Sequence, residues 1–271
     1  MPANQGEGAV ITGAASGIGR AIAAALAADG FSVVIADLDE ANGRTAAAEI
    51  GVSNQGRTIF HGVDVTDRAS VGAAIEACTR QFGSIKVMVN NAGFNKPEPF
   101  LEASEDTWHK IMNVNALGVM IGMQEAAKAM IAKKTNGKII NTASIAGRTG
   151  YAEWAPYCAS KFAVVALTHA GARALAANGI TVNAFAPGVV GYPAMGTTRQ
   201  GSHGNGRQFG ARRGHGQFFQ IDPAWPRGST RGRRRHREVP GLTRIRLYDG
   251  PGSDDRRRND PAIGVSSGGH L

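Results

Sequence analysis

Hydrophobic and polar positions in the first 195 residues form two kinds of segment. Short runs of β-branched and other apolar residues predict strands at 9–11, 32–36, 86–89, 138–140 and 180–184. Alanine-rich stretches between them predict helices at 19–29, 41–50, 67–82, 104–132 and 156–177. Because apolar strands alternate with helices, the pattern predicts a parallel sheet covered on both faces. Right-handed crossovers would make it a doubly wound α/β sheet in a single domain.

The pattern changes after Met195, where Gly, Arg, Ser and His dominate and apolar periodicity ends. Residues 1–195 hold 15 Lys+Arg and 15 Asp+Glu, so the net charge of +9 comes entirely from the remainder. Residues 196–271 hold 15 Arg, no Lys and 6 Asp+Glu. A segment of this composition buries little apolar area, so we expect it to be disordered. The sequence therefore predicts a domain at 1–195 and an Arg/Gly-rich tail at 196–271.

Several protein classes are disfavoured by what the sequence contains. It has no apolar run of about 18 residues and no signal-peptide pattern at its start, which favours the cytoplasm. Its two cysteines, Cys78 and Cys158, are too few for a disulfide framework and suit a reducing compartment. No His/Cys/Asp cluster has metal-ligand spacing, so no metal is expected.

A glycine-rich turn lies between the first predicted strand and helix, where residues 12–19 read T-G-A-A-S-G-I-G. Glycines there permit a tight turn, and the N–H groups and dipole of the helix favour a pyrophosphate. Asp37 ends the second strand, 20 residues after Gly17. Its carboxylate could accept hydrogen bonds from ribose hydroxyls and would repel a 2′-phosphate, which favours NAD over NADP. The alternatives are an ordinary strand–helix loop, and an Asp37 that only starts a turn with Asp39.

A second constellation contains Tyr157 and Lys161, which are four residues apart and share one face of a predicted helix. An ammonium near a phenol lowers the phenol pKa from its ordinary value of about 10. Such a phenol could exchange a proton with a substrate oxygen near neutral pH. Ser144 lies 13 residues before Tyr157, just after a predicted strand, and could hold that oxygen. On its own, however, a Tyr-x-x-x-Lys pair is common and usually lies on a solvated helix face.

Residues 9–195 resemble the short-chain dehydrogenase/reductase family, which has a Rossmann fold. The matching elements are the glycine-rich turn, Asp64 with Val65, the N-N-A-G sequence at 90–93, a tetrad of Asn, Ser, Tyr and Lys, and the P-G pair at 187–188. The resemblance implies four catalytic residues: Asn115, Ser144, Tyr157 and Lys161. It also implies a cofactor site made of Gly13, Ser16, Gly17, Ile18, Gly19, Asp37, Asp64, Val65, Asn91, Ala92, Gly93, Tyr157, Lys161, Pro187, Gly188 and Val190.

The activity implied by the resemblance is hydride transfer between NAD and a small secondary alcohol or ketone. Tyr157 would be the acid/base, Lys161 would lower its pKa and bind the nicotinamide ribose, and Asn115 would hold a water that links Lys161 to solvent. Residues 137–144 and 187–190 look similar to acetoin reductase/2,3-butanediol and polyol dehydrogenases. An NADPH-dependent 3-oxoacyl-type reductase is an alternative, against which Asp37 argues. The family also implies a homo-oligomer, commonly a tetramer, and no membrane partner.

The tail departs from the family, whose members continue with a helix pair and a last strand. Codons that fit residues 195–200, read one base later, encode W-E-Q-L-D, which would continue a helix. Similar recoding of 246–252 and 255–259 gives D-Y-M-T-G-Q and I-D-G-G-M, which resemble the family's final turn and strand. We therefore interpret residues from about 196 as frame-shifted, with the last strand missing and both substrate lid and assembly impaired. The alternatives are a natural basic tail that binds nucleic acid and an inactive product.

Overall fold

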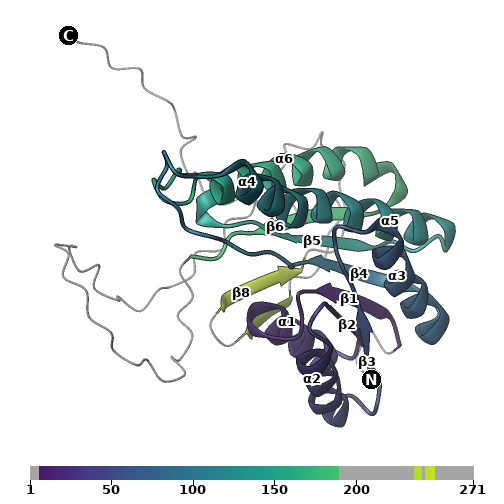
Figure 1. The fold of residues 1–271 in the computed structure, drawn as a ribbon. Helices are drawn as coiled ribbons and strands as arrows, with labels where there is room; N and C mark the ends of the chain where they lie inside the picture. The colour runs from purple at the N-terminus through teal and green to yellow at the C-terminus, as the bar shows by residue number, and fades with distance from the viewer. Residues whose placement is uncertain (1–5, 189–234, 240–241, 248–271) are drawn as a thin grey trace.

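The structure is a computed structural model that describes residues 6–188 and, for the backbone, 235–239 and 242–247. A six-stranded parallel sheet runs through it in the order β3-β2-β1-β4-β5-β6 (Figure 1). Its strands are β1 (Gly8–Thr12), β2 (Ser32–Asp37), β3 (Thr58–Gly62), β4 (Ile85–Asn90), β5 (Lys138–Thr142) and β6 (Thr181–Phe185). The predicted doubly wound α/β sheet is confirmed.

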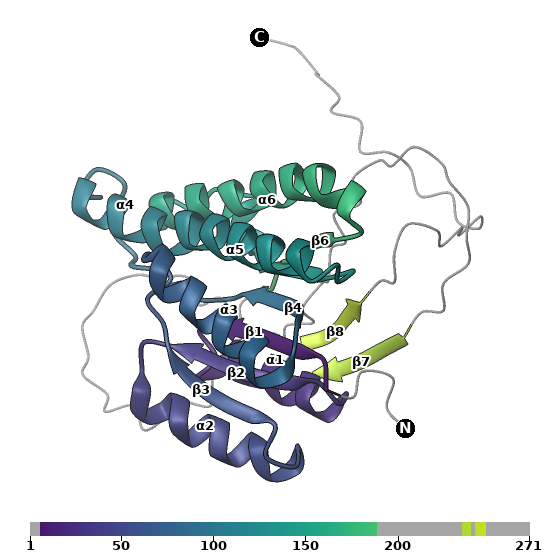
Figure 2. The ribbon, with the colours of Figure 1, turned by 90° about the vertical axis from the view of Figure 1, so that its right-hand side faces the viewer.

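Helices cover both faces of this sheet (Figures 1 and 2). One face carries α1 (Gly17–Ala28) and α2 (Glu40–Ser53), and the other carries α3 (Arg68–Phe82), α4 (Glu105–Met112), α5 (Gly118–Ala132) and α6 (Ala155–Leu175). Three short turns complete the domain: η1 (Asn113–Leu117), η2 (Ile145–Gly147) and η3 (Ala176–Asn178). Each face has its own cluster of buried apolar side chains, as a strand layer between two helix layers requires.

The central strands are apolar on both faces because both faces are covered. Val10 of β1 packs in one core cluster and Ile11 in the other, and both are almost fully buried. Side chains cap the first turns of three helices: Asp39 accepts a hydrogen bond from the Asn42 N–H, Asp67 from the Ala69 N–H and Ser104 from the Thr107 N–H.

Two features of the six-stranded sheet and its helices differ from the sequence prediction. No strand was predicted at Thr58–Gly62, because β3 is an edge strand whose residues are mostly half-buried and carry the polar His61. The predicted helix 104–132 is interrupted at Asn113–Leu117 by a π-helical turn, which inserts one extra residue into the turn between α4 and α5. The interruption matters for the site because Asn115 lies inside this turn.

The sheet places the carboxyl ends of its strands along one edge. Strands β1 and β4 are neighbours, so the chain order reverses between them. Ligands of open α/β sheets bind at such a reversal, outside the carboxyl ends of the strands. The glycine-rich loop, Asn91, Ser144 and Pro187 follow strand ends at this edge, and Asp37 is the last residue of β2.

The described part of the C-terminal segment is a pair of antiparallel strands, β7 (Arg235–Val239) and β8 (Leu242–Leu247). They form a separate two-stranded sheet, and β7 lies beside α1. The other residues after 188 lie outside the described residues, so the predicted disorder and reading-frame change of the tail stay predictions. In the described part of the chain, no helix is long and apolar enough to span a membrane.

Candidate active site

The glycine-rich loop adopts a conformation that other residues would resist. Gly13 and Gly17 have φ values of +64° and +56°, in the left-handed region. A Cβ on Gly13 would lie 2.8 Å from the Cα of Ala92, so the loop and the N-N-A-G segment touch through backbone atoms. A Cβ on Gly19 would collide with the carbonyl oxygen of Gly13. The predicted glycines are therefore required by the backbone path.

Two polar side chains fasten this loop to the end of β4. Asn91 donates from Nδ2 to the carbonyl oxygens of Thr12 and Gly13, each at 3.1 Å. The Thr12 hydroxyl oxygen accepts hydrogen bonds from the N–H groups of Asn91 at 3.0 Å and Ala92 at 3.1 Å. Thr12 was the first residue of the predicted motif but was not predicted as a site residue.

The acidic residues predicted to face the adenosine lie beside the same loop. Asp37 accepts a hydrogen bond from the Ala15 N–H at 2.9 Å on one carboxylate oxygen and from the Asp39 N–H at 3.1 Å on the other. Asp37 therefore also supports the glycine-rich loop. Asp64 accepts hydrogen bonds from the N–H and the hydroxyl of Thr66 at 2.8 and 2.7 Å, while the Val65 side chain packs in the core.

The structure brings three of the four predicted catalytic residues together. Ser144 follows β5, and its side chain lies near the Tyr157 phenol on α6, whose pKa it lowers. Lys161, one helical turn later, places its Nζ 5.6 Å from the centroid of the Tyr157 ring. The Lys161 side chain is buried, with Nζ donating to the carbonyl oxygen of Thr142 at 2.7 Å. The pair is therefore not on a solvated helix face.

Asn115 joins this group through the π-helical turn. Its Oδ1 accepts from the Phe94 N–H at 3.0 Å, and its Nδ2 donates to the Phe94 carbonyl oxygen at 2.9 Å and to the Ser160 hydroxyl at 3.1 Å. A Cβ on Gly93 would lie 2.9 Å from Asn115 Oδ1 and 3.6 Å from Lys161 Nζ, so these groups converge on Gly93.

Ser160 is a site residue that the sequence reasoning missed. It is fully buried, and its hydroxyl accepts from Asn115 and donates to the carbonyl oxygen of Tyr157 at 2.7 Å. It thus connects the asparagine to the helical turn that carries the tyrosine. Its place three residues after Tyr157, on the same helix face, was the available signal.

The prediction of a lowered Tyr157 pKa is wrong for the chain by itself. Burial raises the pKa of the Tyr157 phenol, the hydrogen bond with Ser144 lowers it, and Cys158 raises it, with a net rise. Burial also lowers the pKa of Lys161 to about 8. Desolvation of both groups opposes either becoming charged, and the spacing of Tyr157 and Lys161 in the sequence does not express this effect.

The remaining predicted residues flank this group. The Pro187 carbonyl oxygen accepts from the Ile145 N–H at 3.2 Å, and Gly188 follows it. Val190 lies outside the described residues. Trp154 packs edge-on against Tyr157, with ring centroids 6.2 Å apart. No three His, Cys, Asp or Glu side chains in the described part of the chain are grouped to hold a metal ion.

The site has features that fit a dinucleotide. The Ser16 side chain accepts no hydrogen bond from the first-turn N–H groups of α1, whereas the capping side chains of α2, α3 and α4 do accept one from their helices. Uncapped N–H groups at a helix start suit a phosphate. Because Gly13 has no Cβ, the backbone of Ala92 can approach this loop closely.

Comparison with known proteins agrees with this geometry. A family model described as short chain dehydrogenase matches residues 7–202, well over half of the chain. The chain belongs to the short chain dehydrogenase family. The predicted resemblance is therefore confirmed, and the six-stranded sheet is the fold of this short chain dehydrogenase.

Curated relatives of this short chain dehydrogenase include enzymes named for polyols and diols. It is 44% identical to galactitol 2-dehydrogenase of Agrobacterium fabrum over 182 residues, 67% of this chain and 70% of the relative. It is 43% identical to L-2,3-butanediol dehydrogenase of Corynebacterium glutamicum over 185 residues, 68% and 71% of the two chains. It is 40% identical to an (S)-acetoin-forming diacetyl reductase of Staphylococcus epidermidis over 181 residues, 67% and 70% of the two chains.

Proposed function

We propose that this protein is an NAD-dependent oxidoreductase that interconverts a small secondary alcohol and its ketone, such as a diol, acetoin or a polyol. One observation carries the proposal: Lys161 is buried beside Tyr157 with its Nζ 5.6 Å from the centroid of the phenol ring, and the Ser144 side chain lies close enough to lower the Tyr157 pKa. The relatives named for galactitol, butanediol and diacetyl support this class of substrate.

Ser144 and Tyr157 form a hydroxyl pair that can hold one substrate oxygen. The Ser144 hydroxyl oxygen also accepts from the Ala146 N–H at 3.2 Å, which orients it at the start of η2. Tyr157 can then take a proton from an alcohol or return one to a ketone oxygen. NAD, when bound, supplies the hydride acceptor or donor for the carbinol carbon.

Lys161 has the chemistry to assist that proton exchange. Its pKa of about 8 lies near neutral pH, so the ammonium can give up a proton and regain it without a large cost. A positive charge close to the phenol would favour the phenolate while the proton is away. Asn115 holds Phe94 and Ser160 beside this route and would position a water next to it.

The cofactor would lie along the carboxyl edge of the sheet. Gly13, Ser16, Gly17, Ile18 and Gly19 would hold its pyrophosphate, and Asp37 would hold the adenosine ribose. Asp64, Val65, Asn91, Ala92, Gly93, Pro187, Gly188 and Val190 would line its path, with Tyr157 and Lys161 at the nicotinamide ribose. The negative charge of Asp37 supports NAD rather than NADP. We assign this activity to residues 1–195 and expect a homo-oligomer.

The proposal is tested with the purified full chain. We expect oxidation of 2,3-butanediol, galactitol or sorbitol with NAD, and reduction of acetoin or diacetyl with NADH, at rates well above those with NADP or NADPH. Tyr157→Phe should lower kcat by about 10²-fold or more, since general acid–base catalysis contributes at least that much. NADH should still raise the Tm of this variant, because a ligand that binds only the native state stabilises it.

The outcome separates three cases. If Tyr157→Phe turns over substrate like the wild type, the acid/base assignment is wrong. A wild type that NADH stabilises but that converts none of these substrates would contradict the substrate class. A wild type that neither NADH nor NADPH stabilises would contradict the function as a whole.

A further inference from the structure

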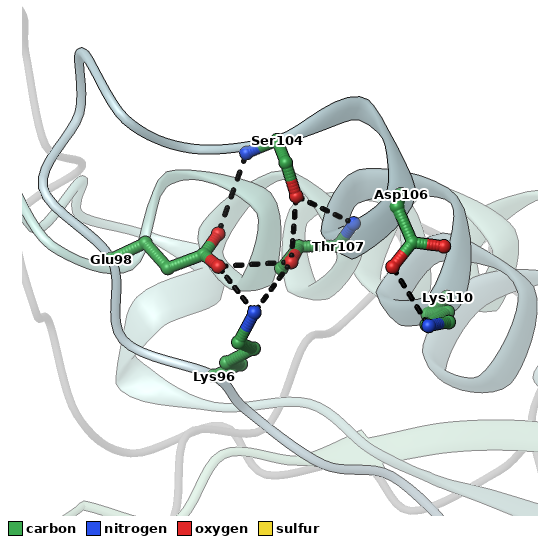
Figure 3. Close-up of polar contacts among 6 residues, drawn as sticks. All are labelled: Lys96, Glu98, Ser104, Asp106, Thr107 and Lys110. Carbon is green, nitrogen blue, oxygen red and sulfur yellow. Dashed lines mark hydrogen bonds and ion pairs between the residues drawn. The ribbon is translucent and has the colours of Figure 1, made fainter.

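A polar cluster lies outside the catalytic group, in the segment 94–104 between β4 and α4 (Figure 3). It joins Lys96 and Glu98 of this segment to Ser104 and Thr107 at the start of α4. The Thr107 residue is only 2% exposed, so its hydroxyl is the buried centre of the cluster.

The Thr107 hydroxyl has three polar partners. It donates to Glu98 Oε1 at 3.0 Å and accepts from Lys96 Nζ at 3.2 Å and from the Ser104 hydroxyl at 3.0 Å. The other Glu98 oxygen, Oε2, accepts from the Ser104 N–H at 3.5 Å. Lys96 Nζ lies 2.5 Å from Glu98 Oε1, and this contact is the largest cause of a lowered Glu98 pKa. The carboxylate therefore stays ionised at neutral pH.

Within the cluster, the side chain of Glu98 is the more enclosed of the ion pair. It is 16% exposed, against 61% for Lys96. An exposed lysine contributes little through an ion pair alone, because solvent screens it and its side chain loses entropy. The connection between Glu98 and α4 therefore depends mainly on the hydrogen bond of its carboxylate with the Thr107 hydroxyl, and its bond with Ser104 holds the end of the segment at the start of the helix.

The same residue is tied to the segment that leads into the catalytic helix. The Glu98 N–H donates to the Glu153 carbonyl oxygen at 2.9 Å. Trp154 follows directly and packs edge-on against Tyr157. At the other end of segment 94–104, Phe94 is held by Asn115 through two hydrogen bonds. Segment 94–104 thus connects Asn115 to the backbone next to Trp154.

We propose that Glu98 is a positioning residue that fixes segment 94–104 and the backbone at Glu153–Trp154 as one wall of the substrate site beside Tyr157. Its carboxylate anchors the segment to α4, and its N–H holds the Glu153 carbonyl in place. The proposal rests on the proposed function for its effect on substrate, whereas the structural connection can be measured without turnover.

Glu98→Ala removes the anchor, and Glu98→Gln keeps an acceptor oxygen for Thr107. The matched control is Asp106→Asn, which breaks the exposed Asp106–Lys110 ion pair of 2.7 Å on the same helix (Figure 3). Thr107→Val removes the buried hydroxyl at nearly constant shape and replaces Glu98→Ala if that variant does not fold. Each protein is assayed for KM and kcat with 2,3-butanediol and NAD, and for amide hydrogen exchange.

For Glu98→Ala and Thr107→Val we expect KM for the diol to rise about tenfold, because a displaced wall weakens binding of the substrate and of the transition state alike. Their kcat and their KM for NAD should change less than about twofold, because the tetrad and the cofactor edge are untouched. In both variants, amide hydrogen exchange should be faster than in the wild type in peptides covering residues 94–104 and 151–156. Glu98→Gln and Asp106→Asn should stay close to the wild type in each respect.

An unchanged KM in Glu98→Ala or Thr107→Val overturns the proposal, as does the same rise in Asp106→Asn. If the wild type converts no substrate, the proposed function fails, and hydrogen exchange then decides for Glu98 alone. Faster exchange at 151–156 in Glu98→Ala but not in Asp106→Asn supports the connection, and equal exchange overturns it.

Discussion

The buried ammonium of Lys161 should make the folded chain less stable than it would be with an apolar side chain. Lys161 is 4% exposed, and burial lowers its pKa from 10.5 to about 8. At about 1.4 kcal/mol for each pKa unit, this shift corresponds to roughly 3 kcal/mol of destabilisation at pH 7. Lys161→Met removes the charge and keeps a side chain of similar length.

The pH dependence of this cost has a definite sign. Between pH 8 and 10.5 the unfolded chain holds the lysine proton more tightly than the folded chain, so stability rises with pH in this range. The cost is fully present below about pH 8 and falls to less than roughly 1 kcal/mol at pH 10.

The hydrogen bond of Lys161 to the Thr142 carbonyl offsets part of that cost. A hydrogen bond with a charged partner contributes about 1.5–3 kcal/mol. We therefore expect Lys161→Met to be more stable than the wild type by about 1 kcal/mol at pH 7. Because the amine still donates to Thr142 at pH 10, the advantage of the variant should fall by roughly 2 kcal/mol between pH 7 and 10.

Urea unfolding of both proteins at pH 7 and 10, at one protein concentration and without NAD, measures the two differences in free energy of unfolding. Lys161→Gln is the control, because it removes the charge and retains a hydrogen-bond donor. A difference in free energy of unfolding between Lys161→Met and the wild type that is the same at both pH values would refute the desolvation argument. Dehydrogenase activity should be lost in Lys161→Met at either pH.

Two further predictions concern the cofactor edge. Asp37→Asn removes the charge that disfavours a 2′-phosphate, and it weakens the hydrogen bond with the Ala15 N–H. The ratio of kcat/KM with NAD to kcat/KM with NADP should therefore fall about tenfold or more. An unchanged ratio would contradict the role of Asp37. Gly13→Ala forces a φ of +64° on a residue with a Cβ, which should lower the stability of the folded chain by about 1–2 kcal/mol. The clash of this Cβ with Ala92 adds to that loss. The Tm of the variant should fall by at least about 2 °C. Gly72→Ala, where a Cβ meets nothing within 4 Å, should leave the Tm unchanged or higher; an equal loss there would show that the left-handed conformation is not the cause.

Much of the fold and the site could be predicted from the sequence because the relevant signals are local. Continuous apolar runs predicted the buried strands, and five of the six strands of the parallel sheet were found in this way. β3 was missed because one strand edge of β3 faces no neighbour in the described sheet, so its residues need not be apolar. Motif spacing also predicted that Ser144, Tyr157 and Lys161 share one site. The prediction was possible because Ser144 follows the end of a strand, and Tyr157 and Lys161 lie on one face of a helix.

Only the tertiary structure decided properties that depend on distant neighbours. The direction of the Tyr157 pKa depends on how completely other elements exclude water from the phenol, which no spacing in the sequence expresses. The π-helical turn at Asn115 is a shift of one residue in the hydrogen-bond pattern, and periodicity predicts the same helix with or without it. The roles of Ser160 and Glu98 depend on partners 45 and 9 residues away, Asn115 and Thr107, whose side chains meet these residues only in the folded chain. The sequence by itself determined which groups this protein carries to the edge of its sheet, and packing decided their charges and their partners, because desolvation and contact exist only in the folded chain.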